Sequence, residues 1–259
     1  MVGQRWRIIV AAIALFGCAS MQASASPWNR DDGGLFLASR LDYFRSATPA
    51  SAYSRFDTDT YVEWGLSNRW MAGGKAVFGT AIIRDANGSR AVSGFGESDG
   101  FLQRQIQRGA HSATALRLAG VWSGDVTDGA RPGGEAGGFD VELRALHGRD
   151  VLVSPFKVFI AAEAGYRHRL SGASDQARAD FLVGVEPSRR FLILLEAQSI
   201  ISVRNNDPGF DDFDLIKAQG SLVWRATRRW SIVAGARTEF AARNIDPGKG
   251  FTFGVWTEF

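Results

Sequence analysis

The last ten residues, Gly250-Phe251-Thr252-Phe253-Gly254-Val255-Trp256-Thr257-Glu258-Phe259, alternate between two kinds of side chain. One parity holds Phe251, Phe253, Val255 and Phe259, with Thr257 as its only polar member. The other parity holds Thr252, Gly254, Trp256 and Glu258. Successive side chains of a β-strand point to opposite faces, so this pattern predicts a strand with one apolar face.

The same alternation runs through most of the chain. Beyond residue 34 there is no sustained helical stripe, and we count twelve alternating stretches of about 9–14 residues. They cover residues 34–45, 56–66, 69–84, 99–108, 113–123, 138–147, 156–170, 178–187, 190–204, 213–225, 228–242 and 249–259. The stretch 99–108 is weak, because Gln103, Gln105 and Gln107 leave neither face clean. Ten or fourteen strands therefore remain open.

Composition narrows the class of protein. The chain has 259 residues, of which 45% are hydrophobic and 22% charged, and it contains one cysteine. This is too apolar for a disordered chain and too poor in cysteine for a disulfide scaffold. The only continuous apolar run, 8–16, is far shorter than the ~20 residues of a membrane helix, which excludes a helical membrane protein.

The connections between the stretches alternate in length. Tight connections lie at 67–68, 109–112, 186–189 and 226–227, with 147–155 somewhat longer. Most of the connections between them are longer, at 46–55, 85–98, 124–137, 171–177, 205–212 and 244–248. Short turns at one end and long loops at the other are typical of a transmembrane barrel. We therefore predict an all-β fold, a closed antiparallel transmembrane β-barrel of about 12 strands.

The positions of four tryptophans indicate that a lipid bilayer surrounds this barrel. Trp64 and Trp70 flank one tight turn with even spacing, and Trp224 and Trp230 flank another. Even spacing across a tight turn returns both side chains to the same face at one rim, where tryptophans form an interfacial belt.

The N-terminus has the order of a secretory signal peptide. Arg5 and Arg7 precede the apolar run, and Ala23-Ser24-Ala25 provides a cleavage site. We predict a signal peptide over 1–25 and a single barrel domain over 26–259, with lipoprotein processing at Cys18 as the alternative. Removal of 1–25 takes away two arginines and no acid, so the net charge falls from +3 to +1. This small charge does not predict a nucleic-acid partner.

The pattern resembles that of bacterial outer-membrane β-barrel proteins, and its terminal Phe259 is similar to their assembly signal. The resemblance implies a monomer in the cell outer membrane with both termini in the periplasm. It also implies contact with membrane lipid and lipopolysaccharide, help from periplasmic chaperones, and recognition of Phe251, Phe253, Val255 and Phe259 by the barrel-assembly machinery.

The polar parity predicts a charged interior. We expect these side chains to line a pore: Arg40, Asp42, Glu63, Lys75, Arg117, Asp140, Glu142, Arg144, Glu163, Arg167, Lys217, Arg237 and Glu239. Both signs occur on neighbouring strands, so arginine–carboxylate pairs are expected, with a constriction near Arg144 and Arg167. Inward glycines at 73, 79, 165, 184, 235 and 254 are expected to leave space for passage, although the same ion pairs would also suit a plugged interior.

These features favour a passive channel or transporter for small polar or charged solutes of unknown identity. A structural or accessory barrel of an export or envelope system is one alternative. An outer-leaflet lipid A hydrolase is the other, because His168 lies near the long-loop rim with Ser171 three residues later. Against an enzyme, no acidic partner for His168 is evident.

No cofactor or metal site is predicted. The acidic segment 205–214 offers oxygen atoms that suit Ca²⁺, but it lacks the regular ligand order of a calcium loop.

Overall fold

The computed structural model describes residues 26–124, 126, 138–152, 156–170, 173–203 and 213–259. It contains thirteen strands: β1 (Leu35–Ala47), β2 (Ala52–Ser67), β3 (Trp70–Asp85), β4 (Gly88–Phe95), β5 (Ser98–Arg108), β6 (Ser112–Trp122), β7 (Phe139–Leu152), β8 (Lys157–Arg169), β9 (Gln176–Ser188), β10 (Phe191–Ser202), β11 (Asp214–Arg225), β12 (Trp230–Arg243) and β13 (Gly248–Glu258). In these ranges no helix has the length and apolar character needed to cross a membrane.

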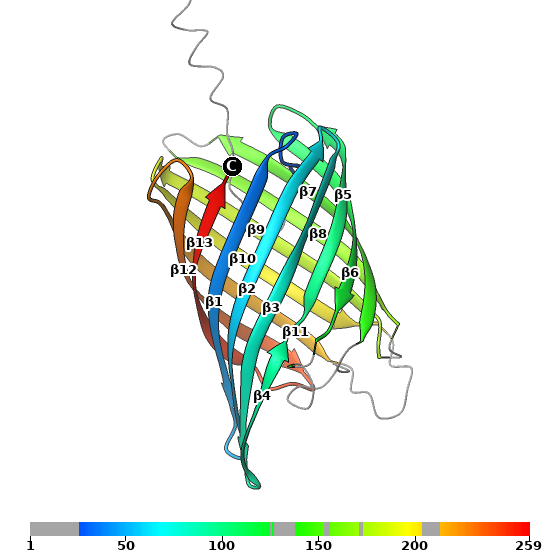
Figure 1. Cartoon of the computed structure of the whole chain (residues 1–259), viewed down its shortest axis with the longest axis vertical. Helices are drawn as coiled ribbons and strands as arrows, with labels where there is room; N and C mark the ends of the chain where they lie inside the picture. The colour runs from blue at the N-terminus through cyan, green and yellow to red at the C-terminus, as the bar shows by residue number, and fades with distance from the viewer. Residues whose placement is uncertain (1–25, 125, 127–137, 153–155, 171–172, 204–212) are drawn as a thin grey trace, which may run out of the picture.

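The strands form one closed antiparallel sheet (Figure 1). β1 pairs with β2 on one side and with β13 on the other, which joins the first strand to the last. β4 and β5 pair with successive parts of β3, 78–85 and 70–75, and so share one place in the barrel wall. The predicted all-β closed barrel of twelve strands is confirmed.

Two predicted long loops are mostly strand. Most of the connection 85–98 is β4, which pairs with β3 around a two-residue turn at Ala86 and Asn87, followed by Gly88 at a φ of 120°. Connection 46–55 shrinks to the four residues between β1 and β2. The long hairpins therefore extend from the end of the barrel opposite the C-terminus (Figure 1). All of the predicted loop 205–212, and residues 125 and 127–137 of the predicted loop 124–137, lie outside the described residues.

Side chains alternate between the two sides of the wall as the sequence pattern predicts. On β13, Phe251 and Phe253 are 64% and 53% exposed on the outside, whereas Thr252 is buried. Trp64, Trp70, Trp224 and Trp230 are all exposed at the tight-turn rim. An apolar outer surface with tryptophans at one rim suits contact with lipid.

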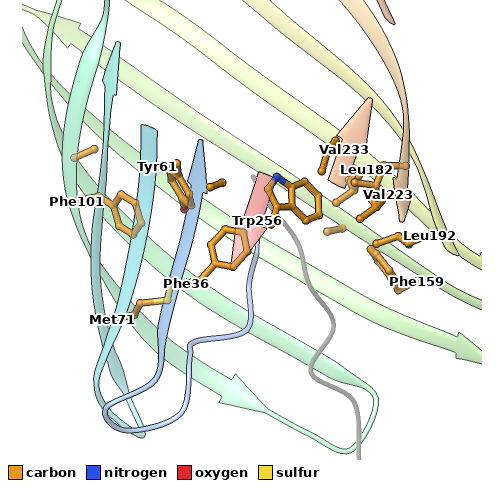
Figure 2. Packing of buried hydrophobic residues seen from close by; sticks show 14 of the residues in the cluster. Phe36, Tyr61, Met71, Phe101, Phe159, Leu182, Leu192, Val223, Val233 and Trp256 are labelled. Atoms are coloured by element: carbon orange, nitrogen blue, oxygen red, sulfur yellow. The ribbon is translucent and has the colours of Figure 1, made fainter. Parts of the chain in front are cut away.

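An apolar cluster occupies the interior near the tight turns (Figure 2). Its largest members, Phe36, Phe159 and Trp256, are almost completely buried. Phe36 contacts the rings of Tyr61 and Trp256 edge-on at centroid distances of 6.3 and 6.0 Å. Each of these residues belongs to the inward parity, close to the tight-turn end of its strand. The interior at that end is therefore a packed core.

The inward glycines do not leave open space, contrary to expectation. A Cβ at Gly184 would lie 1.9 Å from Phe159 Cζ, and one at Gly165 would lie 2.7 Å from Arg144 Cγ. The other four also meet neighbouring atoms within 3 Å, including Phe101 at Gly73 and Arg40 at Gly254. These glycines make room for large side chains on adjacent strands, because the interior is close-packed.

Candidate functional site

Two cavities occupy the half of the interior nearer the long hairpins. Their volumes are about 320 and 280 Å³, and they share Asp42, Lys75, Arg167, Lys217 and Arg237 among their lining residues. We call these two adjoining spaces the vestibule. Because Phe44 and Phe213 line the first cavity whereas Tyr61 and Phe101 line the second, the vestibule runs from the long-hairpin end down to the apolar cluster.

Charged side chains of β7, β8 and β9 form a continuous network on one wall. Arg144 Nη1 lies 2.9 Å from Glu163 Oε2, and its guanidinium also pairs with Glu142 and Asp180. Arg167 Nε lies 2.5 Å from Glu142 Oε2. Planar guanidinium groups can donate to several carboxylates at once, which offsets the cost of removing these charges from bulk water.

A second group of ion pairs lies on the first two strands, β1 and β2. Arg40 Nη2 donates to Asp59 Oδ2 at 2.6 Å. Arg55 Nε donates to Asp57 Oδ1 at 2.6 Å within β2. Both signs of charge therefore surround the vestibule, and most cations are already matched by carboxylates.

Most residues predicted to line a pore face this vestibule. The cavities are lined by Arg40, Asp42, Lys75, Arg117, Asp140, Glu142, Arg144, Glu163, Arg167, Lys217, Arg237 and Glu239. Glu63 is fully buried elsewhere, near the tight turns. Whether these residues conduct a solute stays a prediction.

Glu63 instead binds a segment that enters the barrel at its tight-turn end. This segment, residues 26–34, is called the N-terminal strap. Arg30 Nε lies 2.6 Å from Glu63 Oε2, and Arg30 Nη1 lies 2.9 Å from Glu258 Oε1. Ser26 and Asn29 are buried, so the first part of the strap lies inside the barrel, whereas Asp31 and Asp32 are exposed.

The weak stretch of β5 holds the other side of the strap. Gln103 Nε2 donates to the carbonyl oxygen of Ser26 at 3.0 Å, and Gln105 Nε2 donates to that of Pro27 at 2.8 Å. Gln105 Oε1 accepts from the Asn29 N–H at 2.9 Å. Two of the three glutamines that weakened the alternation, Gln103 and Gln105, are therefore inward groups that satisfy the backbone of the strap, whereas Gln107 is exposed.

Several interior residues were absent from the predicted set. Arg178 shares the inward parity of Asp180 and lines both cavities, so parity alone could have identified it. Asp59 shares the parity of Glu63 in the same way. Glu97, which lies 2.8 Å from Arg167 Nη1, falls between β4 and β5, where the sequence pattern carries no parity.

His168 has an acidic partner, contrary to the sequence-based expectation. Its Nδ1 lies 3.1 Å from Asp175 Oδ1, and the Tyr166 hydroxyl donates to Asp175 Oδ2 at 2.6 Å. Partial burial opposes ionisation, but bonds from Tyr166, the Arg169 N–H and His168 hold the pKa of Asp175 below its ordinary value. His168 is exposed on the outer surface, while Ser171 lies outside the described residues.

The calcium hypothesis falls mainly on residues 205–212, outside the described residues. Its last member, Asp214, lies in β11 and forms an ion pair with Arg243 at 2.7 Å. In the part of the chain that the structure describes, no group of three or more His, Cys, Asp or Glu side chains is placed to hold a metal ion.

Solved structures share this fold. An outer-membrane channel from Pseudomonas putida F1 superposes with a TM-score of 0.68 at 9% identity, covering 92% of this chain and 100% of the channel. The NanC porin gives 0.58 at 10% identity over 85% and 98%. The translocator domain of the autotransporter NalP from Neisseria meningitidis gives 0.51 at 10% identity over 98% and 94%. No family model and no curated protein sequence matches the chain. The fold is that of a twelve-stranded outer-membrane β-barrel.

Proposed function

We propose that this protein is an outer-membrane channel that passes small polar or charged solutes, which enter at the end carrying the long hairpins. The observation that carries the proposal is the vestibule, where two adjoining cavities are lined by charges of both signs. Rings of charged side chains are the usual means by which a pore selects small solutes. The fold shared with a channel and a porin adds support.

The N-terminal strap would act as the gate of this channel. Apart from its peptide link to β1, it is held by hydrogen bonds and ion pairs from Gln103, Gln105 and Glu63. Hydrogen bonds of this kind can be replaced by hydrogen bonds to water. The strap can therefore leave the tight-turn end of the barrel without unfolding a strand. Passage would also require large side chains beneath it, such as Trp256, to change rotamer.

Planar-bilayer recordings test the proposal and the gate together. We expect the refolded protein (residues 26–259) to show infrequent conductance steps. The triple variant Arg30→Gln, Gln103→Ala, Gln105→Ala should open more often. Gln107→Ala is the matched control, because this exposed glutamine lies on the same strand. Arg144→Ala should alter ion selectivity. If all these proteins fold yet never conduct, the channel proposal is wrong.

The His168–Asp175 pair favours a second candidate, an acyl hydrolase acting on outer-leaflet lipid. A carboxylate that accepts from Nδ1 orients an imidazole as a general base. Loss of a lipid A acyl chain in cells expressing the wild type, but not His168→Ala, would support this activity. His147→Ala is the control, because His147 bonds Thr114 at the other rim. Mass spectra of lipid A identical in all strains would exclude it.

A further inference from the structure

Two cations of the vestibule are paired more weakly than the arginines of β7 and β8. Lys217 on β11 has no carboxylate within ion-pair distance among the described residues. Arg237 on β12 approaches Asp42 only at 3.8 Å, and no hydrogen bond to its guanidinium is found within the described part of the chain. By contrast, Arg144 and Arg167 each contact three carboxylates.

Lys217 and Arg237 are close neighbours on one face of the wall. Gln219 lies directly opposite Arg237 in the β11–β12 register, and Lys217 is two residues from Gln219 on the same face. Lys217 itself lies opposite Glu239 of β12, whose Oε2 accepts from the Gly248 N–H, and on its other side opposite Gln198 of β10. The two cations and the two glutamines line the second cavity together, as well as a small space between them.

Cations outnumber carboxylates among the groups that act on Lys217. Arg237, Lys75 and Arg178 repel it, and one carboxylate, that of Asp180, attracts it. Of the carboxylates that line the same space, Asp180 is paired with Arg144, and Glu196 interacts with Arg40. Like charges on neighbouring positions of a sheet face repel each other, and a bound anion would relieve that repulsion.

We propose that Lys217 and Arg237 form a binding station for the oxyanion of a small solute, such as a carboxylate or phosphate. The ammonium and guanidinium groups supply the charge, and the side-chain amides of Gln198 and Gln219 supply further donors. The station deepens the proposed channel function, because it assigns an anionic solute class to the vestibule. Binding at equilibrium, however, needs no conduction.

Calorimetric titration of the refolded barrel in detergent with inorganic phosphate, and separately with succinate, tests the station. Saturable binding is expected for the wild type, and stronger binding of one probe identifies the preferred oxyanion. Lys217→Gln and Arg237→Gln should each weaken binding about tenfold or more, since each removes a charged donor. Lys217→Arg should retain it. Arg225→Gln is the control, because this inward arginine of β11 is paired with Glu186 at the other end of the strand.

The outcomes separate the station from the channel. Binding that depends on Lys217 in a protein that never conducts would keep the station and overturn the channel. Conduction without saturable binding, or wild-type binding by Lys217→Gln, would overturn the station alone. Folding is checked by heat-modifiable migration. If Lys217→Gln fails to fold, Gln198→Glu provides the second variant, because a carboxylate facing Lys217 should abolish anion binding.

Discussion

At the scale of single residues, Gly184 shows how closely the interior is packed. Its replacement by alanine would bring a Cβ to 1.9 Å from Phe159, which is fully buried in the apolar cluster. We expect Gly184→Ala to lower the free energy of unfolding by about 1–3 kcal/mol, because an overpacked core forces side chains off their rotamers. Urea unfolding in lipid vesicles, followed by tryptophan fluorescence, measures the change.

Gly220 provides the matched control for this prediction. It faces outward on β11, where a Cβ would meet only Leu195 Cδ2 at an ordinary 3.7 Å. Gly220→Ala should change stability by no more than about 0.5 kcal/mol. Equal losses in the two variants would mean that backbone preference, rather than Phe159, sets the cost.

The sequence predicts that glycines such as Gly184 face inward, but it does not predict which side chains fill the space beside them. The six inward glycines lie on the predicted face, yet the bulky neighbours that fill their space come from other strands. Phe159 meets Gly184 because of the β8–β9 register, which pairs the two residues directly. A sequence pattern fixes which side a residue faces and carries no information on what lies across from it.

At the scale of strands, Arg144 joins three neighbours. It lies on β7 and contacts Glu163 of β8 and Asp180 of β9, besides Glu142 of its own strand. Arg144→Gln leaves these carboxylates facing one another, and we expect it to reduce the free energy of unfolding by about 3 kcal/mol. Adding Glu163→Gln should recover part of the loss in the same urea assay. A double variant no more stable than the single one would contradict this account.

The strands also show which features a local sequence pattern predicts and which it does not. All twelve barrel strands were predicted because alternation is a local property. β4 was missed, although Asn87-Gly88 is a recognised hairpin signal. The inward glutamines of β5 made that strand look weak, since their partners in the N-terminal strap are more than seventy residues away in sequence. Similarly, Asp175 meets His168 only because the chain turns back between β8 and β9.

At the scale of the whole molecule, we expect the Phe259 side chain to matter for assembly of the barrel and little for its stability. Its backbone closes the barrel through hydrogen bonds with Leu35, while its ring is 63% exposed on the outside. Phe259→Ala keeps the backbone bonds, so stability should change by no more than about 0.5 kcal/mol. We expect slower appearance of the heat-modifiable form in pulse-chase experiments, because the assembly machinery would lose its terminal aromatic. Leu41→Ala, equally exposed on β1, is the control; wild-type kinetics for Phe259→Ala would refute the signal.

The two ends of the barrel should face different compartments. Tight turns face the periplasm in barrels of this class, so the long hairpins are expected at the cell surface and both termini in the periplasm. Asn87 lies at the tip of the β3–β4 hairpin and Arg228 in a tight turn, and both are exposed. The sole cysteine, Cys18, lies in the predicted signal peptide. A membrane-impermeant maleimide should therefore label Asn87→Cys on intact cells, and Arg228→Cys only after the outer membrane is permeabilised, with the unmodified chain as the background. The reverse pattern would invert the barrel and place the mouth of the vestibule in the periplasm.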